Sequence, residues 1–311
     1  MKAMVLAAGL GTRMLPHTRR LPKPLMPVLG KTLLDIAIET IKGINPGLVV
    51  VNSHHLAEKL QRHIRERDFG VPVEISHEPQ ILGTAGGIKA AEKWLAGDHF
   101  AVINSDVLTE PDWEPMLAFH KQRGALATLM LREDPNAAGY GALYMDETGK
   151  ITRFLTSANS GYNEEQKPMM FTGVSILSPE IFDLIPPGRA VDISTEIYRP
   201  LTEKSGALYG YGYKGDWVDA GSVALYHRVV MDRLKREPEM VFTGGKEWRY
   251  LKLRPPVYIH PGAHIRAGCI IGPNVAIHAG SVLGTCVYLK NCVVLPHRHV
   301  RSGGALEGEV I

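Results

Sequence analysis

Residues 2–14 read KAMVLAAGLGTRM, an apolar stretch that runs directly into a loop with two glycines. A continuous apolar run such as that from Lys2 to Ala8 is typical of a strand buried on both faces. Gly9 and Gly11 let the backbone turn tightly and bring its amides close to a ligand. Open α/β sheets hold phosphates in such a loop between a strand and a helix. The stretch therefore predicts a phosphate-binding loop at the end of a buried strand.

This loop differs from two common nucleotide-binding motifs. Met14 stands where the dinucleotide fingerprint requires a third glycine, and no Gly-Lys-Ser/Thr follows as in a P-loop. Arg13 and Lys23 bring two cations to the loop, and its path is stiffened by four prolines, Pro16, Pro22, Pro24 and Pro27. A preorganised cationic loop stabilises a transferring phosphoryl group without reorganising during the reaction.

Beyond the loop, apolar strands alternate with helical stretches. Strands are expected at 48–52, 100–104 and 125–131, and helices at 33–42, 56–67, 85–94 and 115–123. The alternation predicts an α/β, Rossmann-like fold whose mostly parallel mixed sheet has helices on both faces. A β-rich insertion follows at 141–155 and 169–177, and helices are expected at 194–204 and 222–236. We expect a catalytic domain at 1–236 and a linker rich in proline and glycine at 237–256.

The tail, residues 257–311, contains a repeat. Aliphatic residues recur every six positions from Ile259 to Leu295, and glycines between them provide turns. A period of six matches neither a helix nor a long strand, but it fits a parallel β-helix whose short strands stack coil upon coil. The pattern resembles the hexapeptide repeat of left-handed β-helices, in which three repeats complete one coil. Seven repeats predict a short β-helix of a little over two coils.

Composition excludes several classes of protein. The chain has 311 residues, of which 45% are hydrophobic and 22% charged, as in an ordinary globular protein. Its 35 Lys and Arg against 32 Asp and Glu leave a charge of +3, too balanced for binding nucleic acid through charge alone. No apolar run is long enough for a membrane helix or an export signal. Three cysteines, Cys269, Cys286 and Cys292, form no disulfide framework, so we expect a cytoplasmic protein with no membrane or nucleic-acid partner.

Four stretches resemble a known family in the right order. Residues 6–16, LAAGLGTRMLP, followed by PKPL at 22–25, look like the opening motif of the sugar-1-phosphate nucleotidyltransferases, also called NDP-sugar pyrophosphorylases. LGTAGG at 82–87 resembles the loop of that family that surrounds the base and ribose. NSD at 104–106 resembles its Asn-Gly-Asp metal motif, with Ser105 in the middle position. WVDAG at 217–221 resembles its Trp-x-Asp-x-Gly motif, and a hexapeptide tail is also common in the family.

The resemblance implies an enzyme that joins a nucleoside triphosphate to a sugar 1-phosphate and releases pyrophosphate. It implies Mg²⁺ as cofactor, with Asp106 and Asp219 as ligands. Arg13 would hold the β- and γ-phosphates, and Lys23 the α-phosphate or the sugar phosphate. The residues implied in nucleotide binding are Leu6, Ala7, Ala8, Gly9, Gly11, Thr12, Arg13, Gly83, Thr84 and Gly86.

The sugar side departs from the family pattern. Gly141 and Gly173 resemble sugar-lining positions that give access to the backbone. Lys214 is a spare candidate for binding the sugar phosphate, and a solvated lysine is the alternative. Family members often carry Glu-Lys-Pro after the strand that corresponds to residues 151–154. Here LTS stands at 155–157, and EQKP arrives at 165–168. Either a loop is inserted or that sugar contact is gone.

Several alternatives stay open on the sequence. LGTAG at 82–86 and the tail look most like mannose-1-phosphate guanylyltransferases, which favours GTP and mannose 1-phosphate. VNSHHL at 51–56 looks equally like uridylyltransferases acting on N-acetylmuramate 1-phosphate, and a uridylyl- or thymidylyltransferase acting on another sugar 1-phosphate, such as glucose 1-phosphate, is a further alternative. A silent regulatory subunit that binds NDP-sugar would have lost a cation or a metal carboxylate, whereas all four are present. An acyltransferase would need a longer β-helix. The tail is expected to pack on the catalytic domain or to form a homo-oligomer.

Overall fold

The computed structural model describes residues 1–134, 137, 141–154, 167–203, 207–236 and 250–311. The chain forms two compact units, residues 1–10 with 34–218 and residues 11–33 with 219–311. The cationic loop after the first strand is therefore part of the same unit as the C-terminal tail. Contacts between residues far apart in the sequence bring this loop to the tail.

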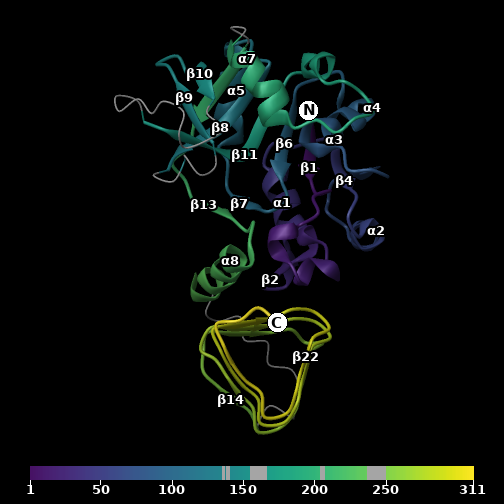
Figure 1. Ribbon diagram of the computed structural model, residues 1–311, viewed down its shortest axis with the longest axis vertical. Coiled ribbons are helices and arrows are strands. Elements are labelled where there is room, and N and C mark those ends of the chain that lie inside the picture. The colour runs from purple at the N-terminus through teal and green to yellow at the C-terminus, as the bar shows by residue number, and fades with distance from the viewer. Residues whose placement is uncertain (135–136, 138–140, 155–166, 204–206, 237–249) are drawn as a thin grey trace. The chain divides into compact units, whose positions relative to one another are not determined.

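One sheet forms the centre of the first unit (Figure 1). Its main path runs β10–β9–β11–β6–β1–β4–β5, and β8 pairs with both β11 and β12. The strands are β1 (Lys2–Leu6), β4 (Val49–Ser53), β5 (Val73–His77), β6 (Phe100–Asn104), β8 (Ala127–Glu133), β9 (Ala142–Met145), β10 (Ile151–Phe154), β11 (Met169–Leu177) and β12 (Leu208–Gly212). β6, β1, β4 and β5 are mutually parallel, whereas β11 is antiparallel to both β6 and β8. The mostly parallel mixed sheet expected from the sequence is confirmed.

Helices cover the sheet, which is why its central strands are apolar throughout. Met4 of β1 packs in one cluster with Ala85 and Ile88 of α3, while Ala3 and Val5 point to the other face and are also fully buried. The helices of this unit are α1 (Leu33–Lys42, whose first residue belongs to the other unit), α2 (Ala57–Arg65), α3 (Gly83–Ala90), α4 (Glu92–Leu95), α5 (Trp113–Gln122) and α7 (Arg199–Glu203). Shorter helical turns span Pro179–Leu184 and Ile193–Tyr198.

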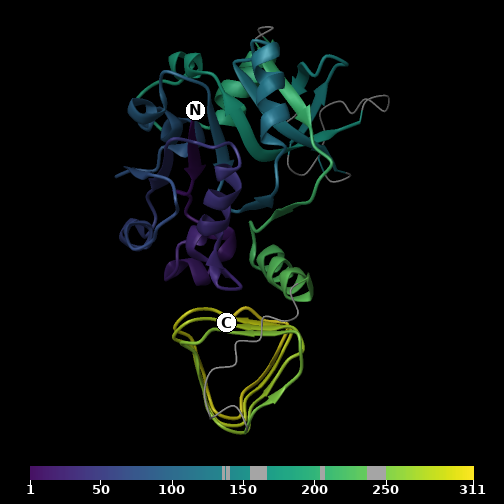
Figure 2. The ribbon, with the colours of Figure 1, turned by 180° about the vertical axis from the view of Figure 1, so that it is seen from behind.

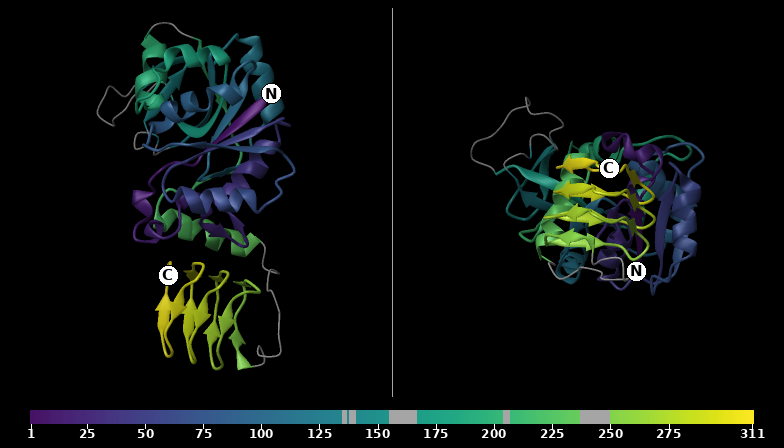
Figure 3. Two further views of the ribbon diagram at one scale, coloured as in Figure 1. Left: turned by 90° about the vertical axis from the view of Figure 1, so that its right-hand side faces the viewer. Right: turned by 90° about the horizontal axis from the view of Figure 1, so that it is seen from below.

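The tail is a three-sided parallel β-helix (Figures 1 and 3). Its three sheets are β14–β17–β20–β23, β15–β18–β21 and β16–β19–β22, and every neighbouring pair is parallel. The strands are β14 (Lys252–Leu253), β15 (Val257–Ile259), β16 (His264–Ile265), β17 (Ile270–Ile271), β18 (Val275–Ile277), β19 (Val282–Leu283), β20 (Tyr288–Lys290), β21 (Cys292–Val294), β22 (His299–Val300) and β23 (Ala305–Glu307). The β-helix thus begins at β14, inside the stretch expected to be a linker, and completes three coils rather than a little over two.

The six-residue register slips once. Ile259 pairs with Ile277 eighteen residues later, but Ile277 pairs with Val294 and not with Leu295. The corner between β20 and β21 is one residue shorter than the corner above it, and Asn291 turns it with a φ of 52°. After this corner, each inward residue lies 17 rather than 18 positions after its partner in the preceding coil, so Val300 lies beside Leu283. Stacking is therefore kept although the strict period of six is not.

One side of the β-helix is covered within its own unit. The outward residue Ala276 on the β15–β18–β21 sheet is fully buried, because α8 (Val223–Arg236) packs on β18 and β21 (Figure 2). The ring of His227 on α8 donates to the carbonyl of Asn291 at 2.6 Å, and the Tyr226 hydroxyl donates to the carbonyl of Pro27 at 2.5 Å. Helix α8 thus joins the β-helix to the cationic loop, whose end forms the hairpin of β2 (Pro27–Val28) and β3 (Lys31–Thr32).

Candidate active site

Polar residues gather where the parallel strands of the first unit end. Asn52 is the penultimate residue of β4, Glu78 follows β5 directly, and Asp106 follows β6 by two residues. The carboxyl ends of parallel strands meet at one edge of a sheet, and ligands of open α/β proteins bind at that edge. The candidate site of the first unit therefore lies at the carboxyl ends of β1, β4, β5 and β6.

The start of the predicted phosphate loop is held by the neighbouring strand β4. Ala7 and Ala8 are each 6% exposed, whereas Gly9 is exposed and Leu6 is half-buried. The Ala7 amide donates to Oδ1 of Asn52 at 2.6 Å. The backbone of residues 6–9 is thus held against the neighbouring strand.

The rest of the loop belongs to the second unit and folds back on itself. Gly11 has a φ of 64°, and a Cβ atom there would lie 2.9 Å from Thr18 Cγ2 and 3.3 Å from Lys23 Cβ. The Thr18 hydroxyl donates to the Gly11 carbonyl at 2.9 Å, which closes the fold. The glycine is required because a side chain would separate Lys23 from the start of the loop. Thr12, in the turn of residues 12–14, is exposed.

Arg13 and Asp219, both in the second unit, are brought together by Gly221. A Cβ atom at Gly221 would lie 2.7 Å from both carboxylate oxygens of Asp219 and 2.9 Å from Nη2 of Arg13. The glycine of the WVDAG stretch therefore leaves room for the Arg13 guanidinium and the Asp219 carboxylate, which are 206 positions apart in the sequence. Lys214, by contrast, is exposed.

Asp106 stands on a two-residue turn between β6 and β7 (Val107–Thr109) and is half-buried. The Ser105 amide donates to the Leu6 carbonyl at 3.0 Å, so this turn is tied to the end of β1. Gly173 of β11 has a φ of 82°, and a Cβ atom there would lie 2.6 Å from Nδ2 of Asn104. Gly173 therefore lies directly against Asn104 of the NSD stretch.

The LGTAGG stretch begins α3 and packs on a segment that the sequence had not singled out, residues 189–193. Cβ atoms at Gly83 and Gly86 would lie 2.6 Å from the Val191 carbonyl oxygen and 2.8 Å from the Arg189 carbonyl oxygen. The Thr84 hydroxyl accepts a hydrogen bond from the Ile193 amide at 2.8 Å. Part of the glycine pattern in this stretch thus serves close packing of backbone on backbone.

The region expected to line the sugar is described only in part. Gly141 has a φ of 91°, the left-handed region that glycine tolerates. The LTS stretch at 155–157 and the first two residues of EQKP lie outside the described residues. Lys167, the third residue of EQKP, makes an exposed ion pair with Glu133 at 3.0 Å.

Two buried polar residues were not foreseen as site residues, Asn52 and Glu78. Glu78 is 1% exposed, its Oε1 accepts from Nδ2 of Asn52 at 2.7 Å, and its Oε2 accepts from the Leu82 amide at 2.9 Å. A polar residue at the end of an apolar strand was the available signal for Asn52. Its pairing with a glutamate 26 positions away was not visible in the sequence.

No group of three or more His, Cys, Asp or Glu residues suited to a metal ion occurs in the described ranges. Mg²⁺ needs no such group, because it is usually bound by one or two carboxylates together with phosphate oxygens and water. Asp106 and Asp219 are hard oxygen ligands of that kind. Within the same ranges, no helix is sufficiently long and apolar to span a bilayer.

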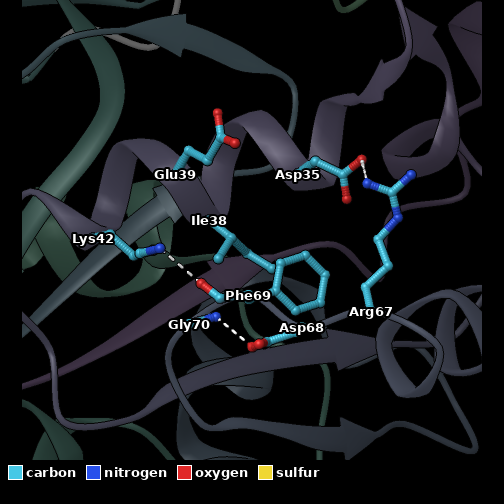
Figure 4. Close-up of a pocket in the computed structure, with 8 residues that line it drawn as sticks. All are labelled: Asp35, Ile38, Glu39, Lys42, Arg67, Asp68, Phe69 and Gly70. Atoms are coloured by element: carbon cyan, nitrogen blue, oxygen red, sulfur yellow. Dashed lines mark hydrogen bonds and ion pairs between the residues drawn. The ribbon is translucent and has the colours of Figure 1, made fainter.

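A cavity of about 250 Å³ lies elsewhere in the first unit, between α1 and residues 67–70 (Figure 4). In its lining, Arg67 pairs with Asp35 at 2.9 Å, and Lys42 donates to the Phe69 carbonyl at 2.7 Å. Residues 67–70 precede β5, so the cavity lies at the opposite edge of the sheet from Glu78. We assign it no ligand.

Comparisons with known proteins identify relatives of both parts of the chain. A family model described as Nucleotidyl transferase matches residues 2–236, and one described as GMPPB C-terminal domain matches residues 253–311. A UTP–glucose-1-phosphate uridylyltransferase of Synechocystis is 29% identical, over 100% of this chain and 87% of its own length. A probable mannose-1-phosphate guanylyltransferase of Arabidopsis thaliana is 32% identical, over 100% of this chain and 86% of its own length.

Solved structures share the fold. A UDP-glucose pyrophosphorylase complexed with UDP-glucose aligns with a TM-score of 0.63 at 23% identity, over 76% of this chain and 98% of that one. The family model over most of the chain and the relatives over all of it lead to one conclusion. The chain belongs to the nucleotidyl transferase family and is a sugar-1-phosphate nucleotidyltransferase.

Proposed function

We propose that the enzyme joins GTP to mannose 1-phosphate, giving GDP-mannose and pyrophosphate. The observation that carries this proposal is similarity over the full chain, tail included, to mannose-1-phosphate guanylyltransferases. The three free cysteines, two of them buried in the β-helix, support a reducing cytoplasmic location.

In the proposed reaction an oxygen of the sugar phosphate attacks the α-phosphorus in line with the departing pyrophosphate. No general base is needed, because a phosphate monoester is already ionised near neutral pH. Arg13 binds the β- and γ-phosphates and stabilises the charge of the leaving pyrophosphate. Lys23 stabilises charge at the α-phosphate or the sugar phosphate. Positioning and charge stabilisation supply most of the acceleration.

Asp106 and Asp219 would hold Mg²⁺, which supplies positive charge to the phosphate oxygens when bound. The residues fit that role, because both are carboxylates and Asp219 lies beside Arg13, a phosphate-binding cation in the same proposal.

The other proposed contacts with the nucleotide and the sugar come from residues near the strand ends. Backbone groups of residues 6–12 and of Gly83, Thr84 and Gly86 would bind the nucleotide. Gly173, which lies against Asn104, and Gly141 would give the sugar access to the backbone, with Lys214 near its phosphate. The left-handed conformation of both glycines supports this, since larger residues there are strained.

A second candidate, UTP with glucose 1-phosphate, is favoured by one observation. The uridylyltransferase of Synechocystis is similar over the whole of this chain at an identity close to that of the guanylyltransferases. The two candidates share the proposed mechanism and differ in the base and the sugar.

Pyrophosphate release with Mg²⁺ tests both. GTP, UTP, dTTP, ATP and CTP are each combined with a panel of sugar 1-phosphates, and Asp106→Ala is assayed beside the wild type. We expect the highest turnover with GTP and mannose 1-phosphate, lost in the variant. Preference for UTP and glucose 1-phosphate would replace the first candidate by the second. No turnover from a folded protein that still binds nucleotide would overturn both.

A further inference from the structure

Two buried side chains connect the loop after β1 to the beginning of α3. Asn52 and Glu78 are 2% and 1% exposed. The Ala7 amide donates to Asn52 Oδ1 at 2.6 Å, Asn52 Nδ2 donates to Glu78 Oε1 at 2.7 Å, and the Leu82 amide donates to Glu78 Oε2 at 2.9 Å. The result is one unbroken chain of hydrogen bonds from residue 7 to residue 82.

The chemistry of the donors fixes the direction of this chain. A backbone N–H can only donate, so Asn52 must turn its oxygen to Ala7 and its nitrogen to Glu78. An ionised carboxylate can only accept, and both oxygens of Glu78 do so. Hydrogen bonds to a charged acceptor are shorter and stronger than neutral ones, and a buried group left without its partner is costly.

The surrounding structure is shaped for the pair. A Cβ atom at Gly87 would lie 2.7 Å from both Asn52 Nδ2 and Glu78 Oε1, so a larger residue would break their bond. The Glu78 amide donates to the Ser53 carbonyl at 2.8 Å, and a ring nitrogen of His54 donates to the Glu78 carbonyl at 2.8 Å. Backbone and side chain of Glu78 are therefore both held at the end of β4.

We propose that Asn52 and Glu78 are positioning residues that fix the loop of residues 6–9 relative to the start of α3, and that nucleotide affinity depends on this connection. The inference rests on the proposed function, which assigns both segments to the nucleotide. Neither side chain is placed on the nucleotide itself. Because both segments would hold the same ligand, an error in their separation weakens nucleotide binding more than sugar phosphate binding.

A pair of isosteric substitutions tests the connection. In Glu78→Gln, the new NH₂ group faces either the Leu82 amide or Nδ2 of Asn52. Both of these groups are donors, so one hydrogen bond is replaced by a contact between two donors. Asn52→Asp sets two carboxylates against each other. The double variant Asn52→Asp with Glu78→Gln restores every donor and acceptor: Asp accepts from Ala7 and from the Gln amide, whose oxygen accepts from Leu82. Glu74→Gln, an exposed position of β5, is the matched control.

The readouts are the calorimetric Kd for GTP and UTP with Mg²⁺, and the KM for each substrate. We expect each single variant to raise the nucleotide Kd about tenfold or more. The KM for sugar phosphate should stay within about twofold, and the double variant should recover nucleotide affinity to within about threefold. Single variants that bind like the wild type, loss of both substrates alike, or a double variant no better than the singles would overturn the inference.

Hydrogen exchange at the Ala7 and Leu82 amides, measured without nucleotide, separates this inference from the proposed function. Faster exchange in the single variants and recovery in the double variant would establish the connection itself. If the wild type binds neither nucleotide, the proposed function and the predicted affinity change both fail, while the connection is judged on exchange. Unchanged exchange in the single variants would contradict it.

Discussion

The strand ends of the α/β sheet and the coils of the β-helix bury different kinds of side chains. At the strand ends, buried polar groups have specific partners, as Asn52 has in Ala7 and Glu78, and Glu78 in Asn52 and Leu82. In the coils, the buried side chains are mostly aliphatic and each position recurs 17 or 18 residues later, as with Ile259, Ile277 and Val294. Single substitutions should therefore alter function at the strand ends and only stability in the coils.

Two buried histidines show the same contrast. His120 of the first unit is fully buried, and its ring nitrogens bond to Thr128 at 2.8 Å and Ser178 at 3.1 Å. His278 of the β-helix is 2% exposed, and its Nε2 has no hydrogen-bond partner among the described residues. The two histidines thus differ: both ring nitrogens of His120 have partners, whereas Nε2 of His278 has none among the described residues.

The largest effect is expected at a strand end. Asp106→Asn keeps the shape of the side chain but removes its charge, and under the proposed function it should lower kcat by about 10²- to 10⁴-fold. Asp112→Asn, the same change at an exposed position, should leave kcat within about twofold. Steady-state pyrophosphate release measures both. Equal activity of the two variants would contradict the functional half of the comparison.

In the coils, Leu289→Ala should cost stability without altering catalysis. Leu289 is fully buried, and removing a buried leucine side chain costs about 2–5 kcal/mol of unfolding free energy. Leu306→Ala, in the half-buried last coil, should cost less. Urea unfolding measures the loss, and kcat is measured at a temperature where both variants are folded. A changed kcat with unchanged stability would show that a single coil residue acts on the reaction.

Acid should weaken the first unit through His120. Burial, with smaller contributions from His99 and Lys121, lowers the pKa of His120 to about 4 from an ordinary 6.5. In the unfolded chain this histidine binds a proton below about pH 6.5, whereas in the folded chain it binds one only below about pH 4. The unfolding free energy therefore decreases as the pH falls from about 6.5 to about 4. From about pH 7.5 to about pH 5 the contribution is about 2 kcal/mol. In His120→Gln the fall in unfolding free energy over that range should be smaller by this amount, and an unchanged slope would contradict the assignment.

The smallest effect is expected at His278. Burial lowers the pKa of its ring to about 3, so it is neutral, and its unpartnered nitrogen gains nothing from the fold. His278→Leu should change the unfolding free energy by no more than about 1 kcal/mol, in either direction. The same substitution at His120 removes the hydrogen bonds to two buried hydroxyl groups and should lower the unfolding free energy by about 2–3 kcal/mol. Equal costs at the two sites would remove the contrast between them.

Local patterns were sufficient for much of the fold. The apolar runs predicted β1, β4, β6 and β8, and the six-residue period predicted the β-helix. β5 was missed, because it lies at the end of the sheet's path with exposed residues such as Glu74 and His77. The slip at Asn291 depends on the length of one corner, which a strict period conceals.

Features of the site that depend on distant residues could not be predicted. The motifs placed Arg13, Asp106 and Asp219, but not the meeting of Arg13 and Asp219 at Gly221. The sequence also did not show that residues 11–33 join the β-helix unit, or that Asn52 pairs with Glu78. In each case the contact joins strand ends or loops that only the folded chain brings together.

The most direct test of the account follows an oxygen atom. A sugar 1-phosphate labelled with ¹⁸O in the bond between C1 and the phosphate is converted with the preferred nucleotide, and the products are analysed by mass spectrometry. Attack of the phosphate on the α-phosphorus leaves that bond intact, so we expect all of the label in the NDP-sugar and none in pyrophosphate. Label in pyrophosphate or in free phosphate would contradict nucleotidyl transfer as described.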